Sequence, residues 1–234
     1  MDILCVLTDS HRILFDKYFI KTIPNPEKVI VKTIDVEGDG HYNSESWQKA
    51  VSKKIEFVLS YLIKVENGTI FIFSDVDVQF FPEFNVELVR NELIKSKKDI
   101  LFQKETSNSD SMTVNTGFYV AKSSPGLLKF FNDVLEALKN SKIKNDQTCI
   151  NMLIKDSLIN WGYLPFNYYA WSHGFPPPNT IFCHHANHAG IINKKINQMI
   201  LVRAYVEGGY LKKKFILLLS KLNMKLKILK SYLK

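Results

Sequence analysis

The stretch FIFSDVDVQFFPE, residues 71–83, places two carboxylates one residue apart, directly after an apolar run that is typical of a buried strand. If the strand continues through them, Asp75 and Asp77 point to one side of it and Val76 and Val78 point to the other. Two like charges that converge are unfavourable unless water or a cation lies between them, and hard divalent cations prefer oxygen ligands. The pair is therefore either a cation site or two solvated aspartates in the turn after a strand.

Segments typical of strands alternate with segments of helical period on both sides of this stretch. Apolar residues recur at helical spacing over residues 44–64, and a second helix is expected over residues 125–141, with Pro125 near its start. The expected strands are residues 3–8, 28–35, 69–77, 99–105 and 117–123. Strands separated by helices predict an α/β fold with a mixed, mostly parallel sheet flanked by helices. We expect one domain over residues 1–205 and a basic amphipathic helix over residues 206–234.

The composition is that of a soluble globular protein, because 46% of the 234 residues are hydrophobic and 23% are charged. The three cysteines, Cys5, Cys149 and Cys183, have neither metal-ligand nor redox spacing, which favours a reducing compartment. The N-terminal run MDILCVLTDS is too short for a signal sequence and has an acid where the basic region should be. We therefore expect a cytoplasmic protein whose first strand begins here.

The net charge of +8 comes entirely from the end of the chain. Residues 211–234 contain eight lysines and no acidic residue, whereas residues 1–210 contain 23 basic and 23 acidic side chains. The neutral body has no basic stripe with interleaved aromatic residues, which argues against nucleic acid as a partner.

Apolar residues in this C-terminal segment recur at spacings of four and three, which places them on one helical face. The face consists of Phe215, Leu219, Leu222, Leu226, Leu229 and Leu233. A basic amphipathic helix of this kind suits peripheral contact with an anionic membrane surface through residues 211–234. The same spacing also fits a coiled-coil seam or a helix that packs on the body.

Polar residues stand at the carboxyl ends of two of the expected strands, where open α/β sheets bind their ligands. Thr8, Asp9 and Ser10 follow the first strand, so they and the Asp75–Asp77 pair should face the same crevice. Residues 181–190, IFCHHANHAG, contain three of the six histidines. An imidazole completes an oxygen-rich site for an ion such as Mn²⁺, and the neighbouring glycine lets a phosphate approach the backbone. The alternative is a surface loop whose histidines form local hydrogen bonds.

Four motifs in this order resemble the nucleotide-diphospho-sugar transferase family of glycosyltransferases, which has the Rossmann-like GT-A fold: FSDVDVQFF, VNTGFYVAKSS, NDQTCIN and HHANHAGIINKK. The resemblance covers about residues 1–200. It implies that Asp75, Asp77 and His185 hold Mn²⁺ or Mg²⁺ against the diphosphate of a UDP- or GDP-sugar. It also implies that Asp146 and Gln147 are catalytic residues that contact sugar hydroxyls near the anomeric carbon.

The resemblance assigns further residues to the nucleotide and the donor sugar: Thr8, Asp9, Ser10, Lys54, Ser74, Val76, Asn115, Thr116, Gly117, His188, Gly190 and Lys194. A solvated lysine is the alternative reading of Lys54, and ordinary polar residues at a strand end are the alternative for the first three. The glycine after HAN stands one position earlier than in the family. Lys194 and Lys195 are therefore alternatives for the phosphate contact.

Sugar transfer releases a nucleoside diphosphate, so a divalent cation and a lysine would stabilise the negative charge that develops on it. The resemblance favours a retaining hexosyl- or pentosyltransferase acting on a glycan or a lipid-linked acceptor, whose side of the site residues 167–179 would shape. A metal-dependent phosphodiesterase is one alternative, but it would need more carboxylates around two metals. A non-catalytic module that binds sugar nucleotides or glycans is the other, and the intact Asp-x-Asp and the late histidine argue against it.

Overall fold

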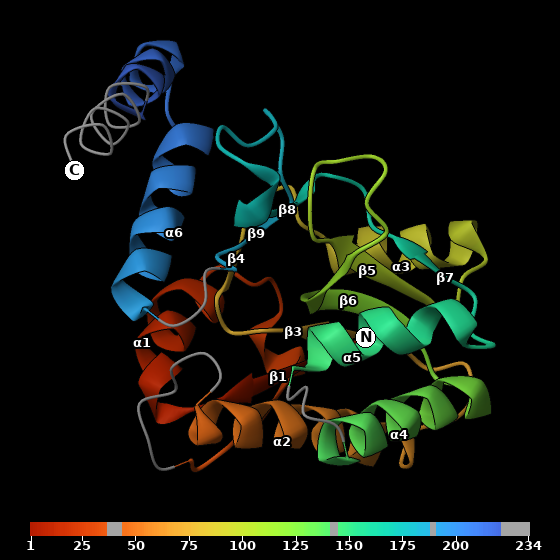
Figure 1. Cartoon of the computed structure of the whole chain (residues 1–234). Helices are drawn as coiled ribbons and strands as arrows, with labels where there is room; N and C mark the ends of the chain where they lie inside the picture. Colours follow the sequence, from red (N-terminus) through yellow and green to blue (C-terminus); the bar gives the residue numbers. More distant parts are fainter. Residues whose placement is uncertain (37–43, 141–144, 188–190, 221–234) are drawn as a thin grey trace.

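The computed structural model describes residues 1–36, 44–140, 145–187 and 191–220 of the chain. Its main feature is a six-stranded sheet with the order β2-β1-β3-β6-β5-β7 (Figure 1). The strands are β1 (Asp2–Leu7), β2 (Val29–Thr33), β3 (Ile70–Ser74), β5 (Ile100–Lys104), β6 (Val114–Lys122) and β7 (Trp161–Tyr163). Every neighbouring pair is parallel except the two that involve β6, which is antiparallel to β3 and to β5. The predicted mixed, mostly parallel sheet is confirmed.

The expected strand over residues 69–77 is too long, because β3 ends at Ser74. Asp75, Val76 and Asp77 form a turn between β3 and β4, which spans Val78–Phe80. The prediction that one strand face orients both carboxylates is therefore wrong. The turn is fixed instead by its neighbours, since the Asp75 amide donates to the Gly117 carbonyl at 2.7 Å.

A second, small sheet was not predicted. It contains three strands of three residues each in the order β4-β9-β8, where β8 is Tyr168–Ala170 and β9 is Cys183–His185. Gln79 and Tyr169 lie opposite His184 in this sheet, whereas Val78 and Ala170 lie opposite His185. Because side chains alternate along a strand, the two histidines point to opposite faces of the small sheet.

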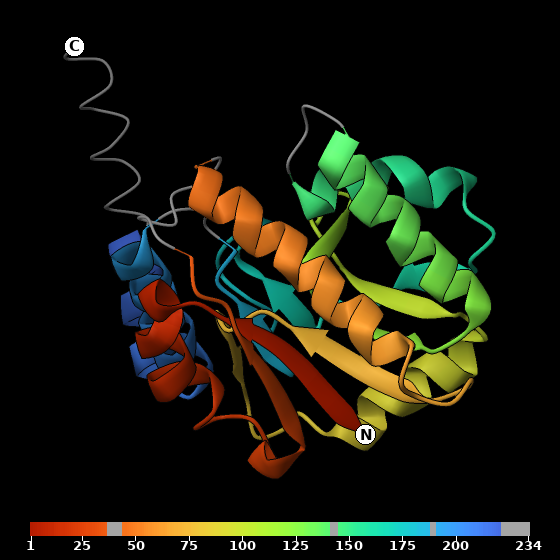
Figure 2. The same cartoon turned by 90° about the horizontal axis from the view of Figure 1, so that it is seen from below.

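Helices cover both faces of the large sheet. Helices α2 (Glu45–Leu62) and α4 (Pro125–Asn140) cross one face together with α5 (Asp146–Leu153), and α3 (Val86–Ser96) packs on the other (Figures 1 and 2). The hydroxyl of Ser44 accepts a hydrogen bond from the Trp47 amide, which caps α2 where its apolar periodicity begins. The two predicted helices are confirmed to within a few residues.

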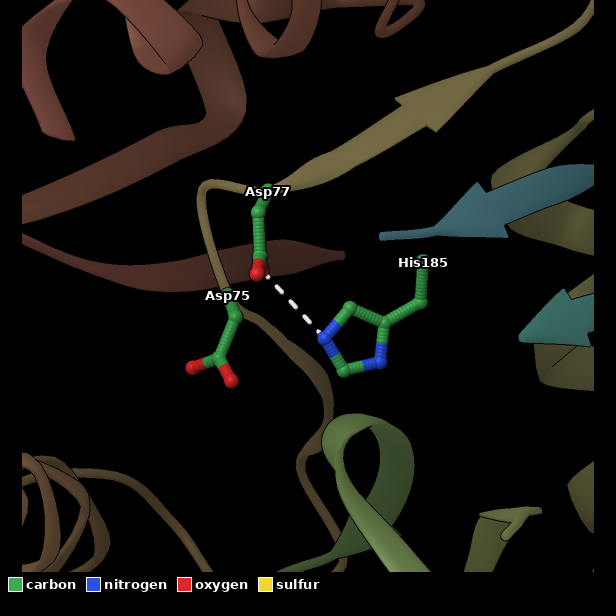
Figure 3. Close-up of side chains that lie close together, drawn as sticks. All are labelled: Asp75, Asp77 and His185. Carbon is green, nitrogen blue, oxygen red and sulfur yellow. Dashed lines mark ion pairs between the residues drawn. The ribbon is translucent and has the colours of Figure 1, made fainter. Parts of the chain in front are cut away.

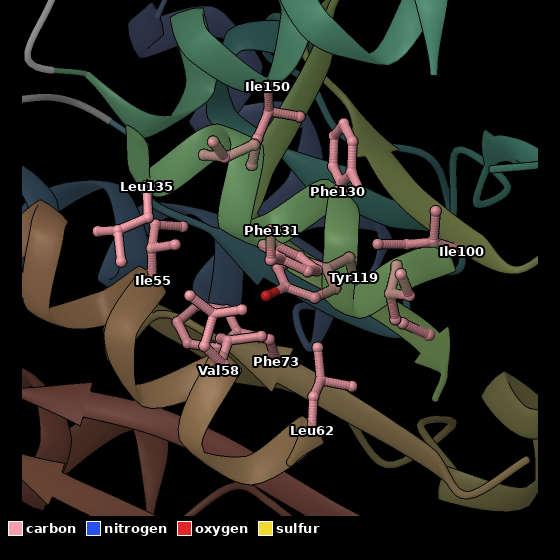
Figure 4. Close-up of a cluster of buried hydrophobic side chains, with 14 of the residues drawn as sticks. Ile55, Val58, Leu62, Phe73, Ile100, Tyr119, Phe130, Phe131, Leu135 and Ile150 are labelled. Atoms are coloured by element: carbon pink, nitrogen blue, oxygen red, sulfur yellow. The ribbon is translucent and has the colours of Figure 1, made fainter. Parts of the chain in front are cut away.

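The larger hydrophobic cluster lies between the sheet and helices α2, α4 and α5 (Figure 4). The Tyr119 ring of β6 stacks on Phe73 of β3 at 5.2 Å between centroids and on Phe131 of α4 at 6.0 Å. All three side chains are at most 1% exposed. This packing fixes the edge of the sheet from which the polar residues described below project.

The chain continues after the small sheet with α6 (Ile192–Val206), which packs on α1 (Arg12–Leu14) through Met199 and Leu14 (Figure 1). Residues 210–220 are again helical. Shorter helical turns span Asp9–His11, Phe15–Phe19, Pro26–Lys28, Ile154–Asp156 and Trp171–His173. None of the helices in the described ranges has the length and apolarity that crossing a membrane requires.

Candidate active site

A pocket of about 340 Å³ opens at the edge of the large sheet where β1, β3 and β5 end. Because β6 runs in the opposite direction, its first residues reach the same edge. Residues that line the pocket include Thr8, His11, Lys54, Asp75, Val76, Asp77, Glu105, Asn115, Thr116, Gly117, Asp146, Gln147, His185, Asn187 and Lys195. Segments that are far apart in the sequence thus meet at the carboxyl ends of the strands, where open α/β sheets bind their ligands.

Two carboxylates and one imidazole meet at one wall of this pocket. Asp75, Asp77 and His185 each present a ligand atom, and these atoms lie within 4.8 Å of one another (Figure 3). Asp77 and His185 are each 4% exposed, whereas Asp75 is half-buried. The Ala186 amide donates to the Asp77 carbonyl at 2.9 Å, which ties β9 to the turn. Two carboxylate oxygens and one imidazole nitrogen fit a divalent cation.

Lys54, Asp75 and Asp146 form what we call the Lys54 cluster. The Lys54 ammonium lies 3.0 Å from Asp75 Oδ1 and 2.9 Å from Asp146 Oδ2. It also donates to the Thr116 carbonyl at 3.2 Å. Asp146 is the first residue of α5, where the Asn145 side chain caps the helix by accepting from the Thr148 amide at 3.1 Å. Lys54 is therefore not a solvated surface lysine.

Asp77, His185 and Lys195 form the Lys195 cluster, which lines the same pocket. Asp77 Oδ2 lies 2.5 Å from the Lys195 ammonium, and its other oxygen lies 3.3 Å from His185 Nε2. Lys195 projects from the first turn of α6 and its side chain is 11% exposed. Lys194, by contrast, is exposed, so Lys195 is the lysine of this pair that lines the pocket.

The two aspartates of the turn have opposite pKa shifts. Burial raises the pKa of Asp75, and Lys54 offsets this only in part because Asp77 and Asp146 add like charge. Burial would also raise the pKa of Asp77, but the Lys195 ammonium outweighs it and holds that pKa well below its ordinary value. Burial would lower the pKa of Lys54, but Asp146 and Asp75 outweigh it and raise that pKa. Asp77 is thus the better neutralised of the two carboxylates.

Gly117, which the resemblance assigns to the nucleotide and donor sugar, lies directly beside the His185 ring. A Cβ atom at this position would lie 2.1 Å from His185 Cε1, so only glycine leaves room for the imidazole. Next to it, the Thr116 hydroxyl donates to Asp146 at 3.1 Å, and the Thr116 amide donates to Gln147 Oε1 at 3.4 Å. The start of β6 therefore joins the candidate metal ligands to Asp146 and Gln147.

The other predicted residues lie in different places. Thr8, Asp9 and Ser10 line a smaller adjoining pocket of about 110 Å³, together with Trp47. Val76 lines the main pocket, whereas Ser74 is fully buried and its hydroxyl donates to the Asp75 carbonyl. His188 and Gly190 lie outside the described residues.

Residues that the sequence reading missed also line the pocket. The Glu105 carboxylate accepts hydrogen bonds from the side-chain amide of Asn115 at 2.5 Å and from that of Asn187 at 3.2 Å. Glu105 directly follows β5, which runs parallel to β3, so the carboxyl-end rule would have indicated it. Burial lowers the pKa of His11 to about 4, and the nearby Lys195 adds to this effect.

A family model described as nucleotide-diphospho-sugar transferase matches residues 18–217. No curated protein sequence matches the chain significantly.

Solved structures of glycosyltransferases resemble the chain. A glycosyltransferase involved in the glycosylation of the major capsid of PBCV-1 aligns with a TM-score of 0.50 and 12% identity, over 86% of this chain and 100% of that one. Mouse xyloside xylosyltransferase 1 aligns with a TM-score of 0.51 and 10% identity, over 82% and 99%. At these identities the two likenesses show the fold alone, which is the expected GT-A fold. The glycosyltransferase GlyE of Streptococcus pneumoniae TIGR4 has a TM-score of 0.48 and 8% identity over 79% of this chain, which spans only 53% of GlyE.

Proposed function

The chain belongs to the nucleotide-diphospho-sugar transferase family, and on that premise we propose that it transfers a sugar from a UDP- or GDP-sugar to a hydroxyl group of a glycan or lipid-linked acceptor. The transferred sugar is a hexose or a pentose, and its anomeric configuration is retained. The proposal rests on one observation: the Asp75–Asp77–His185 cluster lines the same pocket as Asp146 and Gln147.

We assign Mn²⁺, or Mg²⁺ in its place, to the three-residue cluster. A ligand set of two carboxylates and one imidazole suits Mn²⁺, because imidazole is a softer ligand than the oxygens that Mg²⁺ prefers. Such a cation, when bound, supplies Lewis-acid stabilisation of the leaving diphosphate.

The side chains around the cluster then have distinct tasks in the proposal. Lys195 provides a positive charge for the diphosphate, and Lys54 holds Asp75 and Asp146 in place. Residues 8–10 and the smaller pocket receive the nucleoside. Gln147 and Asn115 face the donor sugar from the first turn of α5 and the start of β6. Residues 167–179 border the acceptor side, where Ser172 donates from its amide to Asn187 at 3.0 Å.

Glu105 bears on the proposed stereochemistry, because inversion requires a base for the acceptor hydroxyl. Both oxygens of its carboxylate already accept hydrogen bonds from the side-chain amides of Asn115 and Asn187. Proton transfer to the leaving phosphate is the alternative that retention allows. We therefore expect Glu105→Gln to retain most of the turnover. Loss of turnover in this variant, together with an inverted product from the unsubstituted protein, would identify Glu105 as the base.

The decisive experiment incubates the protein with a panel of sugar nucleotides and Mn²⁺ and measures release of nucleoside diphosphate. We expect turnover with one donor, and its loss in Asp75→Ala, Asp77→Ala and His185→Ala while the domain stays folded. Asp156→Ala removes an exposed carboxylate outside the pocket and is the matched control. Unchanged turnover in either of the first two variants would refute the proposal.

A second measurement tests whether Asp146 and Gln147 contact the donor sugar rather than the nucleotide. Asp146→Ala and Gln147→Ala should lower turnover far more than the affinity for nucleoside diphosphate measured by calorimetry. If affinity falls equally, these residues build the turn rather than contact the sugar.

The alternatives predict different results in the same assays. A non-catalytic module would bind the sugar nucleotide without releasing nucleoside diphosphate. A phosphodiesterase would release nucleoside monophosphate and would use a second metal, but the described residues contain a single metal-ligand cluster, Asp75–Asp77–His185.

We also propose that residues 206–234 form a separate amphipathic segment that contacts an anionic membrane surface. In the described part of it, Leu211, Phe215, Leu218 and Leu219 are exposed while Ile216 is buried. Lys212, Lys213 and Lys214 lie on the same helix, and each lysine near anionic headgroups contributes on the order of 1 kcal/mol. Leu222, Leu226, Leu229 and Leu233 lie outside the described residues.

Sedimentation with anionic vesicles tests this contact. Deleting residues 211–234 should abolish sedimentation and leave turnover of soluble acceptors nearly intact. Phe215→Asp should weaken it, whereas Ile94→Asp, at an equally exposed apolar position on α3, should not. Full-length protein that ignores such vesicles at low salt would make the segment a packing element. A cytoplasmic location is also proposed, supported by the three free and buried cysteines.

A further inference from the structure

Two buried glutamines hold neighbouring histidines of β9 by hydrogen bonds of opposite direction. Gln103 Oε1 lies 3.1 Å from His185 Nδ1, and Gln79 Nε2 lies 3.0 Å from His184 Nδ1. Both glutamines and His184 are 0% exposed, and His185 is 4% exposed. Since a neutral imidazole has one N–H and one lone pair, each glutamine selects which nitrogen carries the proton.

The orientation of the Gln103 amide follows from its second contact. Its NH₂ group donates to the Tyr168 carbonyl at 3.0 Å, which leaves Oε1, an acceptor, facing His185. Only an N–H at Nδ1 satisfies that buried oxygen, and an unsatisfied buried acceptor costs about 1–3 kcal/mol. The proton on His185 is therefore held at Nδ1, and the Nε2 lone pair faces Asp77 Oδ1 at 3.3 Å.

The Gln79 amide is fixed the other way round. Its oxygen accepts from Arg203 Nε at 3.2 Å, and its NH₂ group also donates to the Met199 carbonyl at 2.9 Å. His184 Nδ1 must therefore accept, and the His184 proton lies on Nε2. His184 faces away from the pocket, with the Tyr169 ring stacked on it at 5.4 Å.

From this geometry we infer that Gln103 is a positioning residue that keeps the Nε2 lone pair of His185 free for a divalent cation. Gln103 does not line the pocket, so it acts only through His185. The pairing of β5 with β6 shifts register between Phe102 and Gln103, and the Gln103 side chain contacts Tyr168 of β8 and His185 of β9. Without Gln103, Asp77 would draw the proton to Nε2, where it would block the cation. The inference rests on the metal site of the proposed function.

The test measures the tautomer of each histidine and the affinity for Mn²⁺ separately. Long-range ¹H–¹⁵N spectra of metal-free protein at pH 8, assigned with His184→Gln and His185→Gln, should show Nδ1–H for His185 and Nε2–H for His184. Gln103→Met should move the His185 proton to Nε2 and weaken Mn²⁺ binding by about 10- to 100-fold, the usual cost of losing such a contact. Gln79→Met is the matched control, and it should change the His184 signals but not the Mn²⁺ affinity.

Gln103→Glu should rescue both readouts, because a carboxylate oxygen again accepts from Nδ1. This variant also decides the question if Gln103→Met does not fold. An unchanged His185 tautomer or unchanged Mn²⁺ affinity in folded Gln103→Met would overturn the inference. Absence of Mn²⁺ binding to the unsubstituted protein would refute the proposed metal site, while the spectra would still show whether Gln103 sets the tautomer.

Discussion

The two lysine clusters line one pocket, and each pairs one ammonium with one aspartate of the same turn. The Lys54 cluster is built from α2 and α5 on the large sheet, whereas the Lys195 cluster is built from α6 and the small sheet. Lys54 pairs with two carboxylates, those of Asp75 and Asp146, whereas Lys195 pairs with a single carboxylate of the described residues, that of Asp77. The pKa of Asp75 is therefore raised and that of Asp77 lowered, although both belong to one three-residue turn.

This difference assigns separate tasks to two residues that look equivalent in the sequence. Asp77 is stabilised as a carboxylate before any cation binds, and its contact with Lys195 contributes to the fold. Asp75 is half-buried, shares its ammonium and faces a like charge, so a cation placed between the two carboxylates relieves its repulsion. Substituting either aspartate should therefore abolish metal binding equally. The free energy of unfolding should fall when Asp77 is substituted but not when Asp75 is.

The largest expected effect is that of Asp77→Asn, which leaves the buried Lys195 ammonium without its counterion. Breaking a buried pair by removing one partner costs about 3–5 kcal/mol, and we expect a loss of that size in the free energy of unfolding from urea denaturation. Asp133→Asn, which breaks the exposed Lys129–Asp133 pair on α4, is the control. That change should cost about 0.5 kcal/mol or less. Similar losses in both variants would mean that the Lys195 cluster does not stabilise the fold.

Gly117→Ala should have the next largest effect, because its Cβ would collide with the His185 ring. Overpacking of this kind costs about 1–3 kcal/mol. It should also displace His185 and abolish Mn²⁺ binding measured by calorimetry, without changing any ligand. Gly126→Ala on α4 meets only ordinary contacts at 3.8 Å and 3.9 Å, so it should leave stability and binding intact. Normal Mn²⁺ affinity in Gly117→Ala would show that the ring position is not critical.

Asp75→Asn sharpens the comparison because we expect a functional loss without a loss of stability. The folded-state pKa of Asp75 is raised, so ionisation of this group lowers stability as the pH rises through that range. Neutralising it should keep the free energy of unfolding of the metal-free protein at or above the original value at pH 7. Turnover with Mn²⁺ should nevertheless disappear. A destabilisation as large as that of Asp77→Asn would remove the distinction between the two clusters.

The smallest expected effect concerns His11, whose pKa burial lowers to about 4 with a further contribution from Lys195. His11 should stay neutral down to about pH 4 in an NMR titration of its ring protons. Lys195→Met removes the repulsive ammonium and leaves Asp77 unpaired, so the pKa of His11 should move up toward its ordinary value of 6.5. Burial persists in this variant, which limits the shift. An unchanged His11 pKa would show that Lys195 does not act across the pocket.

Much of the fold follows from local sequence pattern, because the longer strands and helices with clear hydrophobic periodicity form where the sequence predicts them. The helix over residues 44–64 and the strands around residues 3–8 and 99–105 are confirmed within a few residues. The strands β4, β8 and β9 have three residues each, which is too short for their periodicity to be recognised in the sequence. They pair only in the tertiary structure, where Gln79 and Tyr169 lie opposite His184. Of the missed site residues, Asn187 lies two positions after β9 of the small sheet, whereas Glu105 directly follows β5 of the large sheet.

By itself the sequence indicated the fold class and the sheet edge that carries the pocket, and its resemblance to a known family named Asp75, Asp77 and His185 as a candidate ligand set. Residue type and proximity to strand ends are local properties, so they can be read without coordinates. Only the tertiary structure decided that a turn orients the two carboxylates, that Lys195 rather than Lys194 faces the pocket, and that Gln103 fixes the His185 ring. These outcomes depend on contacts between residues 21 to 120 positions apart, and on burial that turns nearby charges and amides into strong determinants of pKa and tautomer.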